Sequence, residues 1–160
     1  MRPGGSRCLR SIEVEGLPAR LGRLRPLLVR AAAKVLRAHG IGTYSISIAF
    51  VSDRKMAGLN RASLGRRGTT DVIAFDLSER GLPVDLVGDV YVSLDRARRQ
   101  AADFGVGESE EILRLVLHGV LHTIGYEDGT ESRRKKMNEA VEREIALLLR
   151  GRPRARSGVT

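Results

Sequence analysis

The stretch HGVLHTIGYEDG, residues 118–129, places two histidines four residues apart, then a glycine, then two adjacent carboxylates. On an α-helix, side chains four residues apart lie on one face, about 5 to 6 Å from each other, so His118 and His122 can direct their imidazoles at one point. Gly125 follows three residues later, where a helix can end in the left-handed conformation that glycine adopts without strain. The stretch therefore predicts a helix end that also serves a metal site.

A chain reversal at Gly125 would return Asp128 toward the two histidines. The resulting pattern, H-x-x-x-H-x-x-G-x-x-D, offers two nitrogens and one carboxylate oxygen and leaves a position for water, as in catalytic zinc sites. It matches the long zincin signature with Asp in place of the last His, but Gly119 stands where zincin proteases carry their general base, a glutamate. The sequence thus argues against protease chemistry, although a histidine pair before a glycine cap can also be incidental.

Gly119 is itself unusual in a helix. A glycine in the interior of a helix costs about 1 kcal/mol relative to alanine. We therefore expect a strand or a substrate to approach the helix closely at this position.

Outward from this helix, the apolar pattern predicts one domain over residues 1–150. Strands are predicted at residues 7–14, 43–52, 72–75 and 86–92, where apolar residues alternate or form short runs. Helices are predicted at residues 24–38, 53–64, 93–104, 108–124 and 131–149, where apolar residues recur at steps of three and four and end signals flank them. The tail at residues 151–160 is basic and almost without apolar side chains, so we expect it to be disordered.

The composition is that of a globular protein with a basic surface. In 160 residues, 28 lysines and arginines outnumber 19 carboxylates, and the formal net charge of +9 favours an anionic partner such as nucleic acid. Codon bias toward arginine explains the same excess equally well. No apolar run predicts a membrane span, and Glu13 and Glu15 stand where a signal peptide would be apolar. With Cys8 as its only cysteine, the protein is expected in the reducing cytoplasm.

Three motifs resemble the YbeY family, bacterial single-strand-specific endoribonucleases implicated in small-subunit ribosomal RNA maturation and ribosome quality control. HGVLHTIGYED, residues 118–128, resembles the family's H-G-x-L-H-x-x-G-Y-D-H. LNRASLGRRGTTDVIAF, residues 59–75, resembles L-N-x-x-Y-R-G-K-D-x-P-T-D-V-L-S-F, and GDVYVS, residues 88–93, resembles G-D-I-x-I-S. Glu111, seven residues before His118, also has a counterpart, so the resemblance covers most of the chain.

The resemblance implies an α+β fold: a small mixed four-stranded sheet, about five helices packed on its faces, and a zincin-like histidine helix lying across it. It implies a metal-dependent endoribonuclease, a hydrolase in which His118 and His122 act through a metal-activated water. One zinc ion per chain, or another divalent metal, would be held by His118, His122 and Asp128, with Glu127 as a rival third ligand. The implied partners are single-stranded RNA and ribosomal RNA or the small ribosomal subunit, and the protein is expected to be a monomer.

Two residues depart from the family pattern. Asp128 replaces a metal-binding histidine; a carboxylate is an ordinary zinc ligand, but it removes positive charge, so we expect a less acidic bound water and tolerance for harder metals such as manganese. Leu64 replaces an arginine thought to be important for activity, and a leucine cannot stabilise charge developing on a phosphate. Arg61 and Arg66 are the candidate phosphate contacts, with Arg67 beside them, unless these arginines are merely solvated.

Three carboxylates have more than one interpretation. By helical periodicity Glu111 lies about 20° from His118, so it can hydrogen-bond a ligand imidazole, or it can simply favour the helix dipole. Asp71 and Asp89 stand at predicted strand starts, where a turn or cap explains a carboxylate as well as catalysis does.

Two other functions fit the same residues. Leu64 and Asp128 are also expected in a non-catalytic, ribosome-associated RNA-binding factor whose zinc site is structural or vestigial. A hydrolase of another substrate would keep the metal site without the RNA. The sequence also leaves the nucleophile open between water and the ribose 2′-hydroxyl.

Overall fold

The computed structural model describes residues 9–150, so Cys8 and the predicted disordered tail lie outside the described residues. Its elements are β1 (Arg10–Glu15), a 3-10 helix η1 (Ala19–Leu24), α1 (Arg25–Ala38), β2 (Tyr44–Val51), α2 (Asp53–Leu64), β3 (Val72–Asp76), β4 (Leu86–Ser93), α3 (Leu94–Phe104), α4 (Glu108–Thr123) and α5 (Glu131–Leu149). Over this part of the chain the predicted four strands and five α-helices are confirmed. The short helix η1, which the sequence did not predict, buries Leu21 and Leu24 against the core.

The sheet has the order β1-β2-β4-β3. β2 pairs in parallel with both β1 and β4, whereas β3 runs antiparallel to β4. A parallel pair of strands needs a crossover connection, and α1 supplies it between β1 and β2. The predicted mixed four-stranded sheet is confirmed.

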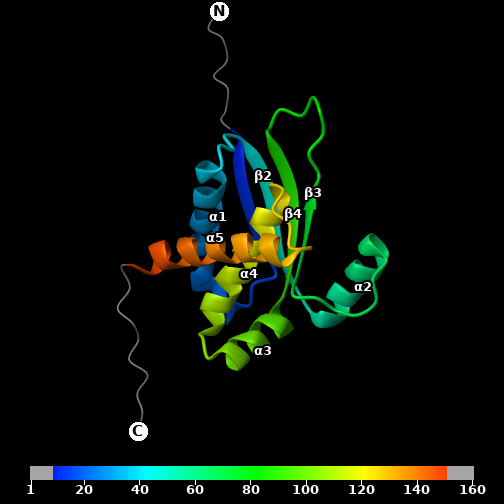
Figure 1. Cartoon of the computed structure of the whole chain (residues 1–160), viewed down its shortest axis with the longest axis vertical. Coiled ribbons are helices and arrows are strands. Elements are labelled where there is room, and N and C mark those ends of the chain that lie inside the picture. Colours follow the sequence, from blue (N-terminus) through cyan, green and yellow to red (C-terminus); the bar gives the residue numbers. More distant parts are fainter. Residues whose placement is uncertain (1–8, 151–160) are drawn as a thin grey trace, which may run out of the picture.

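Helices α1 and α4 pack together on one face of the sheet (Figure 1). Alternate residues of β2 face these helices and are buried: Tyr44, Ile46, Ile48 and Phe50. Between them stand Ser45, which is exposed, and Ser47, which is half-buried. The buried alternate residues of β2 thus supply the apolar surface that these two helices cover.

Helix α4 is the centre of the core. It contacts the strands β3 and β4 and the helices α1, α3 and α5. Its buried apolar side chains are Ile112, Leu113, Leu115, Val116, Leu117, Val120 and Leu121. In Figure 1, α5 crosses α4, which itself lies over the sheet. The histidine helix therefore lies across the sheet, as predicted.

Gly119 faces the sheet at the point of closest approach. A β-carbon at this position would overlap Cγ1 of Val90 in β4 and come within 3.1 Å of Cγ2 of Val72 in β3. Val90 is 1% exposed and belongs to the packed core, so it has little room to move. The expected close approach of a strand to Gly119 is confirmed.

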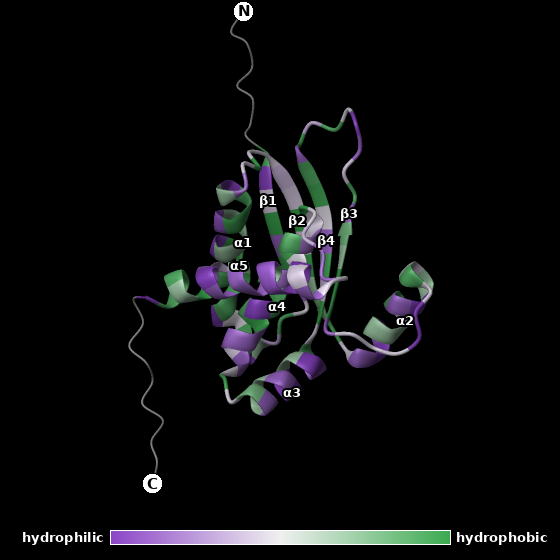
Figure 2. Ribbon diagram, in the orientation of Figure 1, coloured by the Kyte–Doolittle hydropathy of each residue, from purple (hydrophilic) through white to green (hydrophobic). Residues whose placement is uncertain are grey.

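Hydrophobic residues concentrate on the strands and on the inner sides of α1 and α4, whereas hydrophilic residues dominate α5 (Figure 2). This distribution places the polar surface of α5 outward, beside the end of α4. Between residues 9 and 150, no helix combines the length and the apolar character that crossing a membrane requires.

Candidate active site at the end of helix α4

Helix α4 ends in a glycine turn. Gly125 has a φ of 100°, a backbone conformation that residues with a β-carbon rarely adopt. Its N–H donates to the carbonyl of His122 at 3.2 Å, and the N–H of Tyr126 donates to the carbonyl of Leu121 at 3.1 Å. This pair of bonds is a Schellman motif, which satisfies two of the last carbonyls of the helix and turns the chain back. The predicted helix end is confirmed.

The turn also orients the imidazole of His122. Its Nδ1 lies 2.9 Å from the carbonyl oxygen of Tyr126. Because a carbonyl oxygen only accepts, Nδ1 carries the proton and the lone pair of the ring is on Nε2. Nε2 lies 3.8 Å from Oδ2 of Asp128. The turn thus brings Asp128 to the side of His122 that can bind a metal.

His118 lies one helical turn earlier, in a pocket of about 170 Å³. The pocket is also lined by Asp71, Val72, Leu115, His122, Asp128, Arg134, Met137 and Asn138. Burial lowers the pKa of His118 below its ordinary value, and the nearby Asp71 carboxylate opposes this shift only in part. The imidazole is therefore neutral at pH 7, which is the form that offers a lone pair to a metal.

The three predicted ligands line one pocket, and two imidazoles with a carboxylate suit a divalent metal. The fixed tautomer of His122 fits this use, because ligand histidines commonly donate their other ring N–H to a carbonyl. Across residues 9–150, however, no three His, Cys, Asp or Glu side chains are grouped closely enough to hold a metal ion. The structure pairs His122 with Asp128 and places His118 beside them, but it does not assemble the predicted three-ligand centre.

Glu127, the rival third ligand, is engaged by an arginine. Its carboxylate forms an ion pair with Arg133 at the start of α5. Glu127 is not among the residues that line the pocket of His118. This ion pair leaves Asp128 as the carboxylate of the turn that faces the histidines.

A second pocket, of about 420 Å³, adjoins the first. It is lined by Asn60, Leu64, Arg66, Arg67, Thr70, Asp71, Val72, Ile73, Ala74, His122 and Asp128. Both pockets are lined by Asp71, Val72, His122 and Asp128. The two pockets therefore lie side by side along these shared residues, and together they are called the site groove below, with His122 and Asp128 at its middle.

The structure separates the predicted phosphate-binding arginines. Arg66 and Arg67 lie on the wall of the site groove, as does Leu64, which is 45% exposed. Arg61 lines neither pocket. It stands one residue after Asn60 in α2, about 100° around the helix from the face that lines the groove. Of the two arginines predicted as phosphate contacts, the groove contains Arg66 and not Arg61.

Glu111 makes a different contact from the predicted one. Its carboxylate is buried, with the residue 1% exposed, and accepts a hydrogen bond from Arg114 at 2.7 Å. Arg114 also binds Glu110 at 3.0 Å and Glu142 of α5 at 2.6 Å. Glu111 and Arg114 are three positions apart on α4, so their side chains are neighbours on the helix surface and the opposite charges attract. Glu111 therefore helps to join α4 to α5 instead of orienting an imidazole.

Asp71 belongs to the site groove, although the sequence left it between a structural and a catalytic interpretation. Its Oδ1 accepts the N–H of Val72 at 2.8 Å, and its Oδ2 accepts a hydrogen bond from Gln100 at 3.2 Å. It caps β3 and lines both pockets. Its place at the end of a glycine-rich loop, directly before the short apolar run of residues 72–75, was the available signal in the sequence. Asp89 instead pairs with Phe75 inside the sheet and lines neither pocket.

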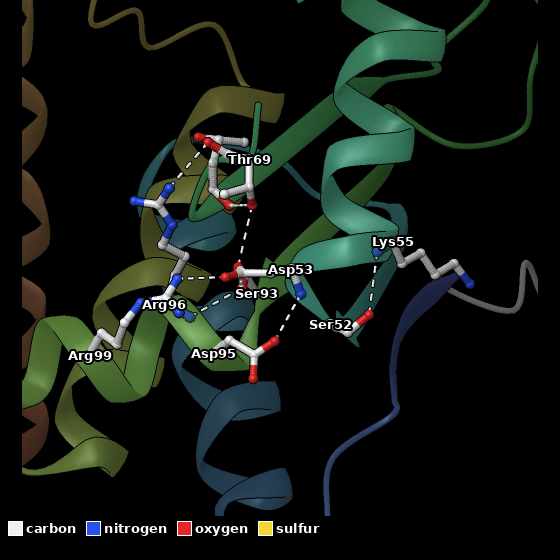
Figure 3. Close-up of polar contacts among 9 residues, drawn as sticks. Ser52, Asp53, Lys55, Thr69, Ser93, Asp95, Arg96 and Arg99 are labelled. Atoms are coloured by element: carbon white, nitrogen blue, oxygen red, sulfur yellow. Dashed lines mark hydrogen bonds and ion pairs between the residues drawn. The ribbon is translucent and has the colours of Figure 1, made fainter. Parts of the chain in front are cut away.

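The loop that forms the arginine wall is held through Thr69 (Figure 3). The Thr69 hydroxyl donates to Oδ1 of Asp53 at 3.3 Å, and Arg96 donates to the Thr69 carbonyl at 3.4 Å. Oδ1 of Asp53 also accepts a hydrogen bond from Ser93 at 2.7 Å, and its Oδ2 pairs with Arg99. The first turns of α2 and α3 thus fix one wall of the site groove.

Asp53→Asn is expected to lower the free energy of unfolding by about 1 kcal/mol at pH 7. Burial raises the pKa of Asp53, but hydrogen bonds from Ser93 and Arg99 outweigh burial and lower the pKa overall. A pKa lowered by folding stabilises the protein above the unfolded-state pKa, and this stabilisation is lost as the pH falls through the folded-state pKa. Urea unfolding should therefore show a deficit in the variant at pH 7 that shrinks as the pH falls below the unfolded-state pKa of about 3.9.

Glu79→Gln is the matched control for this measurement. It removes an exposed carboxylate from the loop between β3 and β4, away from Asp53, and should unfold like the wild type at both ends of the pH range. A deficit of Asp53→Asn that persists unchanged in acid would show that the shape of the side chain, and not its charge, stabilises the loop.

The fold and the site groove together define a class of protein. In this class, one α+β domain carries a histidine helix across a mixed sheet, and the helix ends at a glycine turn facing a wall of arginines. Residues 20–148 match the family model described as Endoribonuclease YbeY. The chain therefore belongs to the YbeY endoribonuclease family, as its motifs led us to expect.

Relatives with this family name match most of the chain. The endoribonuclease YbeY of Pelotomaculum thermopropionicum is 39% identical over 132 residues, which cover 78% of this chain and 86% of that protein. The endoribonuclease YbeY of Thermus thermophilus is 35% identical over 126 residues, which cover 78% of this chain and 91% of that protein. The solution structure of a Thermotoga maritima protein matches with a TM-score of 0.60 and 25% identity, covering 93% of this chain and 99% of that one.

Proposed function

We propose that this protein is a metal-dependent endoribonuclease that cleaves single-stranded RNA. The observation that carries the proposal is the site groove, which has His122 and Asp128 at its middle and His118 beside them. Arg66 and Arg67 on its wall offer positive charge to RNA phosphates. Membership of a family named for endoribonuclease activity supports RNA as the substrate.

His118, His122 and Asp128 would hold one divalent metal, and zinc suits two imidazoles and a carboxylate. When bound, the metal would polarise a phosphoryl oxygen or make a water nucleophilic at neutral pH. The Tyr126 carbonyl keeps His122 in the tautomer that ligation needs, and burial keeps His118 neutral. His118 is therefore ready to bind without first losing a proton, and His122 presents Nε2 to the metal.

Arg66 and Arg67 would hold the RNA backbone on the loop side of the site groove. A guanidinium binds a phosphate through two parallel hydrogen bonds, so these residues would take over from the arginine that Leu64 replaces. The anchoring of Thr69 by Asp53 and Arg96 would keep this loop in place while the strand is bound.

We further propose that the substrate is ribosomal RNA, and that the protein acts in small-subunit ribosomal RNA processing and ribosome quality control. It would act as a monomer in the cytoplasm. The motif resemblance supports this role, and the net charge of +9 suits a partner as rich in phosphate as the small ribosomal subunit.

A second candidate is a non-catalytic RNA-binding assembly factor with a structural or vestigial zinc site. Two observations favour it. Leu64 stands on the groove wall in place of an arginine, and the ligands are not assembled into a three-residue group within residues 9–150. Such a factor would bind RNA without cleaving it.

Metal content and RNA cleavage, measured on one preparation, separate these functions. Wild-type protein should contain about one zinc per chain by elemental analysis. It should cleave a fluorescent single-stranded RNA and leave a duplex of the same sequence intact. A chelator should stop the cleavage and added zinc should restore it. His118→Ala, purified in parallel, should be inactive.

Each contrary result points to a different function. Stoichiometric zinc without cleavage would favour the assembly factor. Equal cleavage by the wild type and His118→Ala would indicate a contaminating nuclease and refute catalysis by this chain. Cleavage that survives full removal of the metal would refute metal dependence.

A further inference from the structure

Helix α5 contributes a cation to the site groove. Arg134 lines the pocket of His118 together with Met137 and Asn138 of the same helix. These three residues are three and four positions apart, so they share one face of α5. Met137 is 1% exposed, which fixes that face of the helix against the core. Arg134 therefore projects from a helix whose position beside the groove is set by packing.

The positive charge near the start of α5 interacts unfavourably with the helix dipole. Residues 133–136 read Arg-Arg-Lys-Lys, and α5 begins at Glu131. Cations near the positive N-terminal end of a helix are unfavourable by about 0.3 to 1 kcal/mol each, and neighbouring cations also repel one another. Arg133 is compensated by Glu127, whereas Arg134 forms no ion pair with any residue in 9–150. Lys135 and Lys136 form no ion pair with these residues either, so it is the position of Arg134 in the pocket of His118 that distinguishes it from them.

Arg134 and the arginine wall lie on opposite sides of the proposed ligands. Of the two pockets of the site groove, Arg66 and Arg67 line the larger and Arg134 lines the smaller. His122 and Asp128 line both. A single RNA strand lying along the groove would therefore meet a guanidinium group before and after the ligands.

We propose that Arg134 is a substrate-binding residue that contacts an RNA phosphate on the α5 side of the site. This inference rests on the proposed function, because it assigns a further contact for the same RNA. A phosphate at Arg134 would gain two parallel hydrogen bonds and would also compensate the unpaired charge at the helix start. Contacts on both sides would hold the intervening phosphodiester over the ligands, which favours reaction through orientation.

Arg134→Gln should raise the KM for single-stranded RNA about five- to tenfold and change kcat much less. Binding can be measured by fluorescence anisotropy in the His118→Ala background, where the RNA stays intact. The slope of log Kd against log salt concentration should become shallower by about 0.7, because the variant would neutralise one phosphate fewer on the single strand. Arg134→Lys should recover most of the affinity, because it keeps the charge.

Lys136→Gln is the matched control. It removes one cation from the same turn of α5, about 200° around the helix from Arg134, and Lys136 lines neither pocket. Its KM, Kd and salt slope should match those of the wild type. Both positions are exposed, so circular dichroism melting should show that every variant is folded.

Equal losses in Arg134→Gln and Lys136→Gln would overturn the inference, because general electrostatic attraction would then explain both. An unchanged KM and salt slope in Arg134→Gln would also overturn it, while cleavage by the wild type left the proposed function standing. A wild type that neither bound nor cleaved the RNA would refute the proposed function, and the inference would fail with it.

Discussion

The His122→Ala variant is expected to cleave single-stranded RNA with a kcat/KM more than about a hundredfold below that of the wild type. Loss of a residue that only orients a metal ligand costs about 10- to 100-fold, and His122 is itself a ligand in the proposed site. Its Nε2 lies 3.8 Å from Oδ2 of Asp128, so the substitution removes the nitrogen that faces the carboxylate. We also expect the variant to lose its zinc.

His39→Gln is the control for this experiment. His39 is the remaining histidine of the chain, and it contacts the Val35 carbonyl at 2.8 Å and the Tyr126 hydroxyl at 3.0 Å. It lines neither pocket of the site groove, so the control should keep both zinc and activity. Elemental analysis and initial cleavage rates test both variants. A His122→Ala protein that retained zinc and cleaved RNA at the wild-type rate would remove His122 from the site.

Gly119→Ala should lower the free energy of unfolding by up to about 2 kcal/mol. The added β-carbon would overlap Cγ1 of Val90, and overpacking a core typically costs about 1 to 3 kcal/mol. Val90 is β-branched and 1% exposed, so neither its rotamer nor its strand can yield easily. The gain of about 1 kcal/mol that alanine normally brings to a helix offsets only part of this cost. Urea unfolding monitored by circular dichroism measures the net change.

Gly58→Ala supplies the matched control within the same protein. Gly58 lies inside α2, is exposed, and has open space where a β-carbon would stand. This substitution should therefore stabilise the protein by up to about 1 kcal/mol. Val90→Ala should relieve the overlap, so the double variant Gly119→Ala/Val90→Ala should lose less than the two single losses added together. Strictly additive losses of unfolding free energy would show that the added β-carbon and the Val90 side chain do not overlap.

Most of the secondary structure was predictable because its signals are local. Ser52 stands directly before α2, is of a residue type that commonly caps helices, and its hydroxyl accepts the N–H of Lys55 at 3.3 Å. Gly125 was expected to end the histidine helix, and it does: its φ of 100° turns the chain out of the helix. Capping bonds and glycine turns join residues only a few positions apart, so their sequence pattern is sufficient. The order of the strands has no such signal, and the mixed sheet was expected only from the family resemblance.

Part of the candidate site was predictable for the same reason. His118 and His122 share a helix face by their spacing, and the turn at Gly125 brings Asp128 within 3.8 Å of His122. Glu111 shows the limit of this reasoning, since helical periodicity placed it near His118 but could not show that Arg114 would bind its carboxylate. Which cation or imidazole binds a carboxylate depends on every charged group within reach, including those of α5.

The sequence by itself determined the helices and the turn that brings Asp128 to His122, because hydrogen bonds between near neighbours specify them. It indicated the strands only through their alternating apolar residues, since the sheet pairs residues far apart in the chain, such as Arg10 with Tyr44. Only the tertiary structure decided which cations reach the ligands. Arg66 and Arg134 line the site groove and Arg61 does not. The groove forms where the loop after α2, the end of α4 and the start of α5 meet, and the packing of α4 on the sheet and of α5 across α4 fixes that meeting.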